Sequence, residues 1–232
     1  MAGLDIFKLN PRGEVNTTLA WGTHRIEFMS GKSQFLRRRI YAQKSYSFTV
    51  CGGRKDLDWL KTFYNKHKGQ YLPFVFKYDG RQEVVYFGSA LRLKVKRELG
   101  VIVGFKAEVS LEIDHRTQVP VFSPSENDTL PKATASVEHS IDWNTKVYTT
   151  SSTERRWEYD KPREKLSVKF KGGKAERDRL MAIFESHEKT PCLFPYDGKL
   201  IKVRLPDSAT FTDYREIKTI IGYSCEMDLE IV

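Results

Sequence analysis

The sequence predicts an α+β protein, mostly antiparallel β, made of two tandem copies of a β-sandwich or barrel with one flanking helix each. An internal repeat is the first observation: YSFTVCGGRKDLDWLKTFYNKHKGQYLPFVFKYDG at residues 46–80 returns as LSVKFKGGKAERDRLMAIFESHEKTPCLFPYDG at residues 166–198. The second is the alternation of apolar and polar residues on either side of each stretch, which is typical of half-buried strands. We therefore predict two units of about 110 residues each, a usual domain size.

The centre of each copy is a helix that begins after glycine and ends near histidine. A short alternating strand stops at Gly52-Gly53 or Gly172-Gly173, and the helix that follows ends near His67 or His187. Apolar residues at helical spacing form one stripe in each copy: Leu57, Leu60, Phe63 and Tyr64, then Leu180, Ile183 and Phe184. Because a helix of about three or four turns is marginal alone in water, we expect the strands to cover this stripe.

The strands after the helix are repeated as well. An aromatic strand closes on Tyr-Asp-Gly at residues 78–80 and again at 196–198, and Asp-Gly between strands is a strong hairpin signal. The long last strand is GFKAEVSLEI at residues 104–113 and GYSCEMDLEI at residues 222–231. The distance from the turn to the last strand is therefore the same in both copies.

Weaker matches lie upstream of these blocks. Residues 24–28 resemble residues 139–143, and the arginine pair 37–38 resembles the pair 155–156. Residues 1–20 show little periodicity, and we interpret them as an arm or an initial strand that leans on something else and is mobile in a lone monomer.

The boundary between the copies is predicted from composition. Residues 115–131 are rich in proline, serine, asparagine and acidic residues, which is typical of a linker or crossover loop. We predict a first domain at residues 1–118 with the N-terminal arm, a linker at 119–131, and a second domain at 132–232.

Composition bounds the possible partners. The chain has 232 residues and a net charge of +9, and a basic surface attracts nucleic acid, anionic membranes or acidic proteins. Its densest basic runs, Arg37–Arg39 and Lys94–Arg97, are short, so we favour solvated strand faces or an acidic protein neighbour over a DNA site. No apolar run approaches the roughly 20 residues that span a bilayer. The stretch MAGLDIFKLNPRGE lacks an apolar signal core, so we expect no export by that route.

The residues that could carry chemistry are few. Cys51, Cys192 and Cys225 are odd in number and lack metal-ligand spacing, so we expect reduced, mostly buried thiols of a cytosolically made protein. Cys192 and Cys225 could pair only if the fold brought them together. His67 and His187 stand where histidine favours the helix dipole, without a ligand cluster nearby, so we assign them a structural role.

The acidic pairs and the glycine pairs are weak candidates too. Glu108 with Glu112, and Glu226 with Glu230, stand at i and i+4 on a strand, about 13 Å apart. Glycosidase carboxyls lie within about 5 to 10 Å, so we favour solvated faces or pairs between subunits. The Gly-Gly pairs resemble phosphate-binding turns but lack P-loop spacing, and we expect them to serve the bend from strand to helix. We predict no catalytic, cofactor-binding or metal-binding residues, and no enzyme.

The order of elements resembles that of the distal tail proteins of long-tailed phages, including the lambda-type minor tail protein M. The resemblance is carried by YSFTV at residues 46–50, by the helix end FYNKHKGQ at 63–70, by the aromatic strands at 74–76 and 193–194, and by the last strand at 108–113. It covers almost the whole of each copy. The family member is a single unit, whereas this chain carries a tandem duplicate.

The resemblance implies a tail-tube-like fold and a structural virion protein of the tail tip, assembled in the host cytoplasm. Copies would form a ring that joins the tail tube protein to hub or baseplate proteins and continues the channel, with genomic DNA only in transit. Small domains with long alternating strands can pair edge to edge between subunits, which fits this expectation. Three chains with pseudo-sixfold symmetry would fill a sixfold ring, or six chains if one unit lines it; we lean to three. The alternatives are a basic nucleic-acid or polyanion-binding module and a cell-wall hydrolase.

Overall fold

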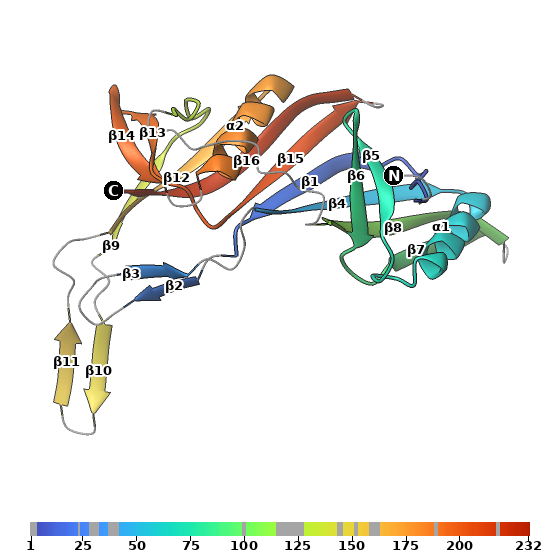
Figure 1. Ribbon diagram of the computed structural model, residues 1–232, viewed down its shortest axis with the longest axis horizontal. Coiled ribbons are helices and arrows are strands. Elements are labelled where there is room, and N and C mark those ends of the chain that lie inside the picture. The colour runs from blue at the N-terminus through green and yellow to red at the C-terminus, as the bar shows by residue number, and fades with distance from the viewer. Residues whose placement is uncertain are drawn as a thin grey trace.

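The computed structural model of the chain is an open, mostly antiparallel β-sheet that carries two helices (Figure 1). It describes every residue except 1–3, 23, 28–32, 37–41, 99–100, 115–127, 143–145, 151–152, 158–162, 188–189 and 217–218. The sheet has twelve strands, and four further strands form two separate hairpins. The prediction of mostly antiparallel β with one helix in each half is confirmed.

The first half supplies eight strands and one helix: β1 (Arg12–Ala20), β2 (His24–Glu27), β3 (Ser33–Leu36), β4 (Gln43–Gly52), α1 (Arg54–Lys66), β5 (Phe74–Tyr78), β6 (Arg81–Phe87), β7 (Arg92–Glu98) and β8 (Val101–Ile113). The second half has the same number: β9 (Glu138–Asp142), β10 (Lys146–Thr150), β11 (Thr153–Trp157), β12 (Arg163–Gly172), α2 (Lys174–Ser186), β13 (Cys192–Tyr196), β14 (Lys199–Arg204), β15 (Ser208–Glu216) and β16 (Thr219–Ile231). β2 with β3, and β10 with β11, form the separate hairpins.

The main row of the sheet runs across both halves. Its order is β9-β12-β16-β15-β1-β4-β8-β7, and every neighbouring pair is antiparallel. The hairpins β13–β14 and β5–β6 branch from the ends of β16 and β8. The two halves therefore meet through strands, at the pair β1–β15.

The halves repeat their hydrogen-bonding pattern as well as their sequence. β4 lies opposite β8 with Gly52 facing Phe105, and β12 lies opposite β16 with Gly172 facing Tyr223. β7 and β15 hold the same place beside the long last strand, and each has a register shift at the same point. These matched positions allow any residue of one half to be compared with its counterpart in the other.

Each half has its own hydrophobic core, and the two cores exchange a few residues. The first is mainly aromatic, from Phe7, Phe48, Phe63, Phe74, Phe76 and Phe87, and the second contains Leu166, Phe170, Phe184, Phe194, Phe211 and Met227. Leu19 and Trp21 of the first half pack in the second core, whereas Ile220 of the second half packs in the first. Burial across β1–β15 thus ties the halves together.

The N-terminal segment is an initial strand, one of the two interpretations that the sequence left open. β1 lies in the middle of the row, between β4 and β15, and both neighbours belong to this same chain. Before it, Ile6 pairs with Val75, and Phe7 is only 5% exposed, with its ring in contact with six other aromatic rings. The expectation of a mobile arm is wrong because this segment fills the first core.

One predicted match between the halves also needs correction. Residues 24–27 form β2 in a hairpin, whereas β9 pairs with β12 as β1 pairs with β4, so the counterpart of β9 is β1. Arg37, Arg38, Trp143 and the linker residues 119–127 lie outside the described residues. The domain boundaries predicted around that linker remain a prediction.

Candidate functional site

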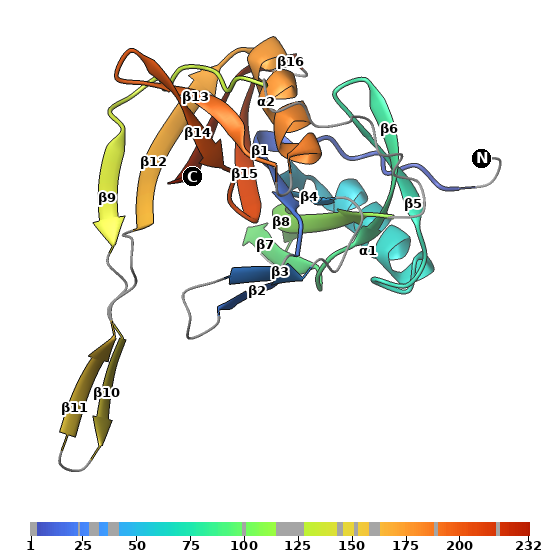
Figure 2. The same cartoon turned by 60° about the vertical axis from the view of Figure 1, so that its left-hand side comes forward.

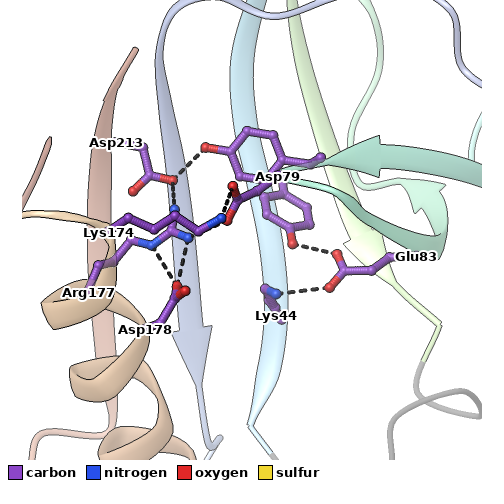
Figure 3. A network of polar contacts seen from close by, with 9 residues as sticks. Lys44, Asp79, Glu83, Lys174, Arg177, Asp178 and Asp213 are labelled. Atoms are coloured by element: carbon purple, nitrogen blue, oxygen red, sulfur yellow. Dashed lines mark hydrogen bonds and ion pairs between the residues drawn. The ribbon is translucent and has the colours of Figure 1, made fainter. Parts of the chain in front are cut away.

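The most distinctive site in the described residues is a buried polar cluster where the halves meet (Figure 3). The turn between β5 and β6 brings Tyr78 and Asp79 from the first half. Helix α2 brings Lys174 and Arg177, and β15 brings Asp213, from the second half. Tyr78, Asp79, Lys174 and Arg177 lie at the ends of their elements, and Asp213 lies on β15, which pairs with β1 of the other half. All five side chains therefore lie at the boundary between the halves.

The contacts of this cluster converge on the Arg177 guanidinium. Its Nη1 donates to Asp213 Oδ2 at 2.6 Å, and its Nη2 donates to Asp79 Oδ2 at 2.7 Å. Lys174 Nζ donates to the other oxygen of Asp79 at 2.5 Å, and Tyr78 Oη donates to Asp213 Oδ2 at 2.5 Å. A single cation thus links two carboxylates that come from different halves.

Burial and charge act in opposite directions on these groups. Asp213 is fully buried, which raises the pKa of its carboxyl, while Tyr78 and Arg177 oppose that rise by donating to it. Burial acts in the same direction on Asp79, but its ion pairs with Lys174 and Arg177 hold the pKa of Asp79 below its usual value. Burial and the Asp213 carboxylate raise the pKa of Tyr78, so the phenol stays protonated and remains a donor.

A second polar group lies beside the first. Lys44 Nζ donates to Glu83 Oε1 at 3.0 Å, and the hydroxyl of Tyr46 donates to the other oxygen of Glu83. The cavity that Lys44 and Tyr46 share with Arg177 measures about 20 Å³. Since a water molecule needs about 10–15 Å³, this space holds little more than one water. The cluster is therefore an ionic joint between packed surfaces and has no room for an organic substrate.

The two histidines mark the same contact in each half. His67 and His187 follow the last turn of α1 and α2, as the sequence predicts, and both are buried. The Nε2 of His67 lies 3.2 Å from Asp5 Oδ2, and the Nε2 of His187 lies 3.5 Å from Asp128 Oδ2. Each histidine thus faces the segment that leads into its own half, a repeat that the sequence blocks did not include.

The glycine pairs form the bend that the sequence predicts. A side chain at Gly52 would place its Cβ 2.4 Å from Asp56 Oδ2, and one at Gly172 would place it 1.8 Å from Glu176 Oε2. Those carboxylates accept from the backbone N–H groups of Gly53 and Gly173. The start of each helix is therefore occupied by an acid of its own first turn, which leaves less room for a bound phosphate.

The remaining candidates are spread over the sheet. Glu108 faces Arg92 across the β7–β8 pair, and Glu112 accepts from Gln43 at 3.1 Å. Glu226 lies 3.7 Å from Lys169, and Glu230 lies 3.4 Å from Arg204. The four glutamates lie on two different strands, β8 and β16, and each lies beside a basic or amide side chain of a neighbouring strand.

The cysteines are free thiols, and only one of them is exposed. Cys192 and Cys225 are buried, and burial raises the pKa of each to about 12, while Cys51 is exposed. The prediction of reduced, mostly buried thiols holds for these residues. Among the described residues, no group of three or more His, Cys, Asp or Glu side chains could hold a metal ion. Neither helix described is long and apolar enough to cross a membrane.

The ionic joint is not predicted from the sequence, although the repeat contains a signal for it. Arg177 and Leu57 occupy the same position of the two helices, and Asp213 and Val95 occupy the same position of β15 and β7. The second half therefore has a charged pair where the first half has two apolar residues. Paired departures of this kind within a repeat indicate a contact that only one copy makes.

No protein-family model matches this sequence, and no curated protein matches it.

Proposed function

We propose that this chain is a structural virion protein of a phage tail tip. Its copies form a ring that joins the tail tube to the hub or baseplate and continues the DNA channel, with a tail-tube-like sandwich or barrel as the repeated unit. One observation carries the proposal: the chain joins two similar units side by side, through a continuous sheet and a buried ionic joint. A ring is built by repeating such a side-by-side strand contact.

The contact between the units is extensive enough to make each chain a rigid doublet. β1 and β15 pair over six consecutive residues, from Val15 opposite Asp213 to Ala20 opposite Ser208. Trp21 Nε1 donates to the carbonyl of Phe184 at 3.2 Å, at the end of α2. Because each chain supplies two units in fixed relation, three chains fill six places with pseudo-sixfold symmetry, which is our preferred stoichiometry.

The second candidate is a polyanion-binding module, and the charge of β7 favours it. Arg92, Lys94 and Lys96 are exposed on one face of this edge strand, within a chain of net charge +9. Binding of this kind weakens steeply with salt, because phosphate contacts release counterions. Retention of duplex DNA at moderate salt, lost with a steep salt slope, supports the module; absence of retention supports the structural role.

Electron microscopy tests the tail-tip proposal directly. Virions that carry a labelled copy of the chain are expected to show the label at the tip of the tail, below the last tube ring. Purified protein is expected to form rings with threefold or pseudo-sixfold symmetry. A label found on the capsid, or along the whole tube, would overturn the proposal, as would virions that lack the protein.

A further inference from the structure

The main row of the sheet ends in two edge strands, β9 and β7. Among the described residues, β9 pairs only with β12 and β7 pairs only with β8, and Figure 1 shows them at opposite ends of the sheet. Every residue of β9 is exposed, as is every residue of β7 except Leu93. Open edges of this kind are templates for pairing with another strand.

The edge strand β9 is the counterpart of β1. Thr18 of β1 lies opposite Ser45 of β4, and Ser140 of β9 lies opposite Lys165 of β12. Ser45 and Lys165 stand at the same distance before the glycine that ends their strands. Ser140 therefore occupies the place of Thr18.

The edge strand β7 is the counterpart of β15. Arg92 of β7 lies opposite Glu108, and Thr210 of β15 lies opposite Glu226, at matched positions of the long last strands. Arg92 therefore occupies the place of Thr210. Within one chain Thr18 lies opposite Thr210, and their Oγ1 atoms are 3.2 Å apart.

We propose that β9 of one copy pairs antiparallel with β7 of the next copy, in the register of β1 with β15. This inference rests on the proposed assembly into a ring and specifies the contact that closes it. The facing pairs follow from the matched positions: Glu138 with Lys94, His139 with Leu93, Ser140 with Arg92, and Ile141 with Leu91.

The charges of the two strands are complementary in this register. Glu138 faces Lys94 directly, and Asp142 lies diagonal to Arg92 on the same face. Opposite charges that face each other across strands stabilise a pair, and like charges oppose it. An acidic edge and a basic edge on one chain favour pairing between unlike edges, and disfavour β7 with β7 or β9 with β9.

The apolar faces are complementary too. Leu19 of β1 is fully buried because it packs into the core of the other half, whereas its counterpart Ile141 is 56% exposed. In the proposed register Ile141 of one copy covers Leu91 and Leu93 of the next, which pack at the rim of the first core. The exposed side chain thus gains the surroundings that Leu19 has within the chain.

The Tyr-Asp-Gly turns supply a third observation. Asp79 and Asp197 hold the same turn position with φ of 53° and 48°, but only Asp79 contacts a helix start, at Lys174. The counterpart of Lys174 is Arg54, the first residue of α1, whose side chain is 70% exposed. Asp197 is exposed as well, and pairing through β9 brings it toward Arg54 of the next copy.

The pairing joins different surfaces of identical chains. A head-to-tail contact of this kind leaves one open edge at each end, so copies add until the rotation between them closes a ring. The same strand pairing then recurs around the ring, alternately within a chain and between chains.

Cysteine cross-linking of the full chain tests the register. In a Cys51→Ser background, Ser140→Cys with Arg92→Cys places the thiols on directly opposite residues, about 4.5–5.5 Å apart at Cα, within disulfide reach. We expect a ladder of linked dimers and trimers on a non-reducing gel under mild oxidation. Thr18→Cys with Thr210→Cys is the positive control, because it links residues within one chain.

An off-register pair is the matched control. Ser140→Cys with Lys96→Cys keeps the face of β7 but lies four residues along it, about 13 Å away, so no ladder is expected. Equal ladders from both pairs, or no ladder from Arg92→Cys at any protein concentration, would overturn the strand pairing. The labelled virions decide the tail-tip proposal separately, so the two can fail independently.

Charge reversal gives a second readout without cysteine. Glu138→Lys is expected to weaken self-association up to about fivefold per contact, and Lys94→Glu in the same chain is expected to restore it. Sedimentation at increasing protein concentration measures both. Equal self-association of all three proteins would contradict the proposed facing of Glu138 and Lys94.

Discussion

Removing the Arg177 guanidinium should destabilise the protein strongly. Arg177→Leu leaves the carboxylate of Asp213, which is 0% exposed, without its cationic partner, while Tyr78 still donates to it. Removing one member of a buried ion pair costs about 3–5 kcal/mol, because the remaining charge stays buried. We therefore expect the free energy of unfolding to fall by about that amount.

The first half of the chain supplies the compensating change. At the positions of Arg177 and Asp213 it has Leu57, which is buried, and Val95, which is 38% exposed on the edge strand β7. The double variant Arg177→Leu/Asp213→Val therefore introduces the apolar side chains that the other copy of the repeat carries at these positions. Replacing a buried ion pair by apolar side chains is often neutral or stabilising. We expect the double variant to recover to within about 1–2 kcal/mol of the parent, the remainder being the acceptor that Tyr78 loses and the cation that Asp79 and Asp178 lose.

Denaturant unfolding followed by tryptophan fluorescence measures this cycle. Parent, both single variants and the double variant are compared at pH 7, and the coupling energy between positions 177 and 213 is the departure from additivity. Because the single variants each lose stability and the double variant loses only about 1–2 kcal/mol, we expect a coupling of at least about 2 kcal/mol in favour of the double variant. Additive effects of the two substitutions would refute the reasoning, because they would show that the carboxylate does not depend on the guanidinium.

Three further outcomes follow from the described contacts. The pKa of Asp79 lies below 3.8 in the folded chain, so ionised Asp79 stabilises the protein above pH 3.8, and this stabilisation is lost as the pH falls through the pKa of the folded state. The variant Asp79→Asn should therefore lose less stability between neutral and acidic pH than the parent, which unfolding measured over a pH series would show. Gly52→Ala should lower the free energy of unfolding by about 1–3 kcal/mol and by more than Gly172→Ala, because its new Cβ lies 2.7 Å from the Cβ of Asp56, which cannot swing away as the carboxylate tip of Glu176 can. Equal midpoints of thermal unfolding for the two variants would contradict this. Phe7→Ala should cost about 3–5 kcal/mol by thermal unfolding, and an unchanged midpoint would show that the N-terminal segment is dispensable.

Local features of this protein could be predicted from sequence because they depend on neighbouring residues. The helices, the Gly-Gly bends and the Tyr-Asp-Gly turns depend on periodicity and on backbone conformation within a few positions. Asp79 and Asp197 both adopt positive φ just before the turn glycine, as the hairpin signal indicates. These predictions are strengthened because each sequence pattern occurs in both halves of the chain.

The order of strands could not be predicted in the same way. β1 has two neighbours, β4 and β15, and β15 lies almost the length of the chain away. No local pattern in residues 12–20 identifies that partner, so the sequence leaves both an arm and an initial strand open. Phe7 was missed for the same reason, because its burial depends on a core assembled from distant aromatic residues.

The ionic joint was missed because each of its members is ordinary alone. Arg177 reads as a polar residue on the outer side of a helix, and Asp213 as a polar residue in a strand. Only their spatial neighbours, Tyr78 and Asp79 of the other half, make them a buried cluster. Comparison with Leu57 and Val95 was the one sequence signal available.

The central place of β1 has a consequence during synthesis. Residues 12–20 leave the ribosome long before β15 and can pair with β4 once the first half has emerged, but the strand that covers their other side ends at residue 216. At a translation rate of about 5–20 residues per second, the edge of β1 that pairs with β15 stays unpaired for roughly 10 to 40 seconds. Neighbouring polysomal chains expose the same uncovered strand until β15 has emerged.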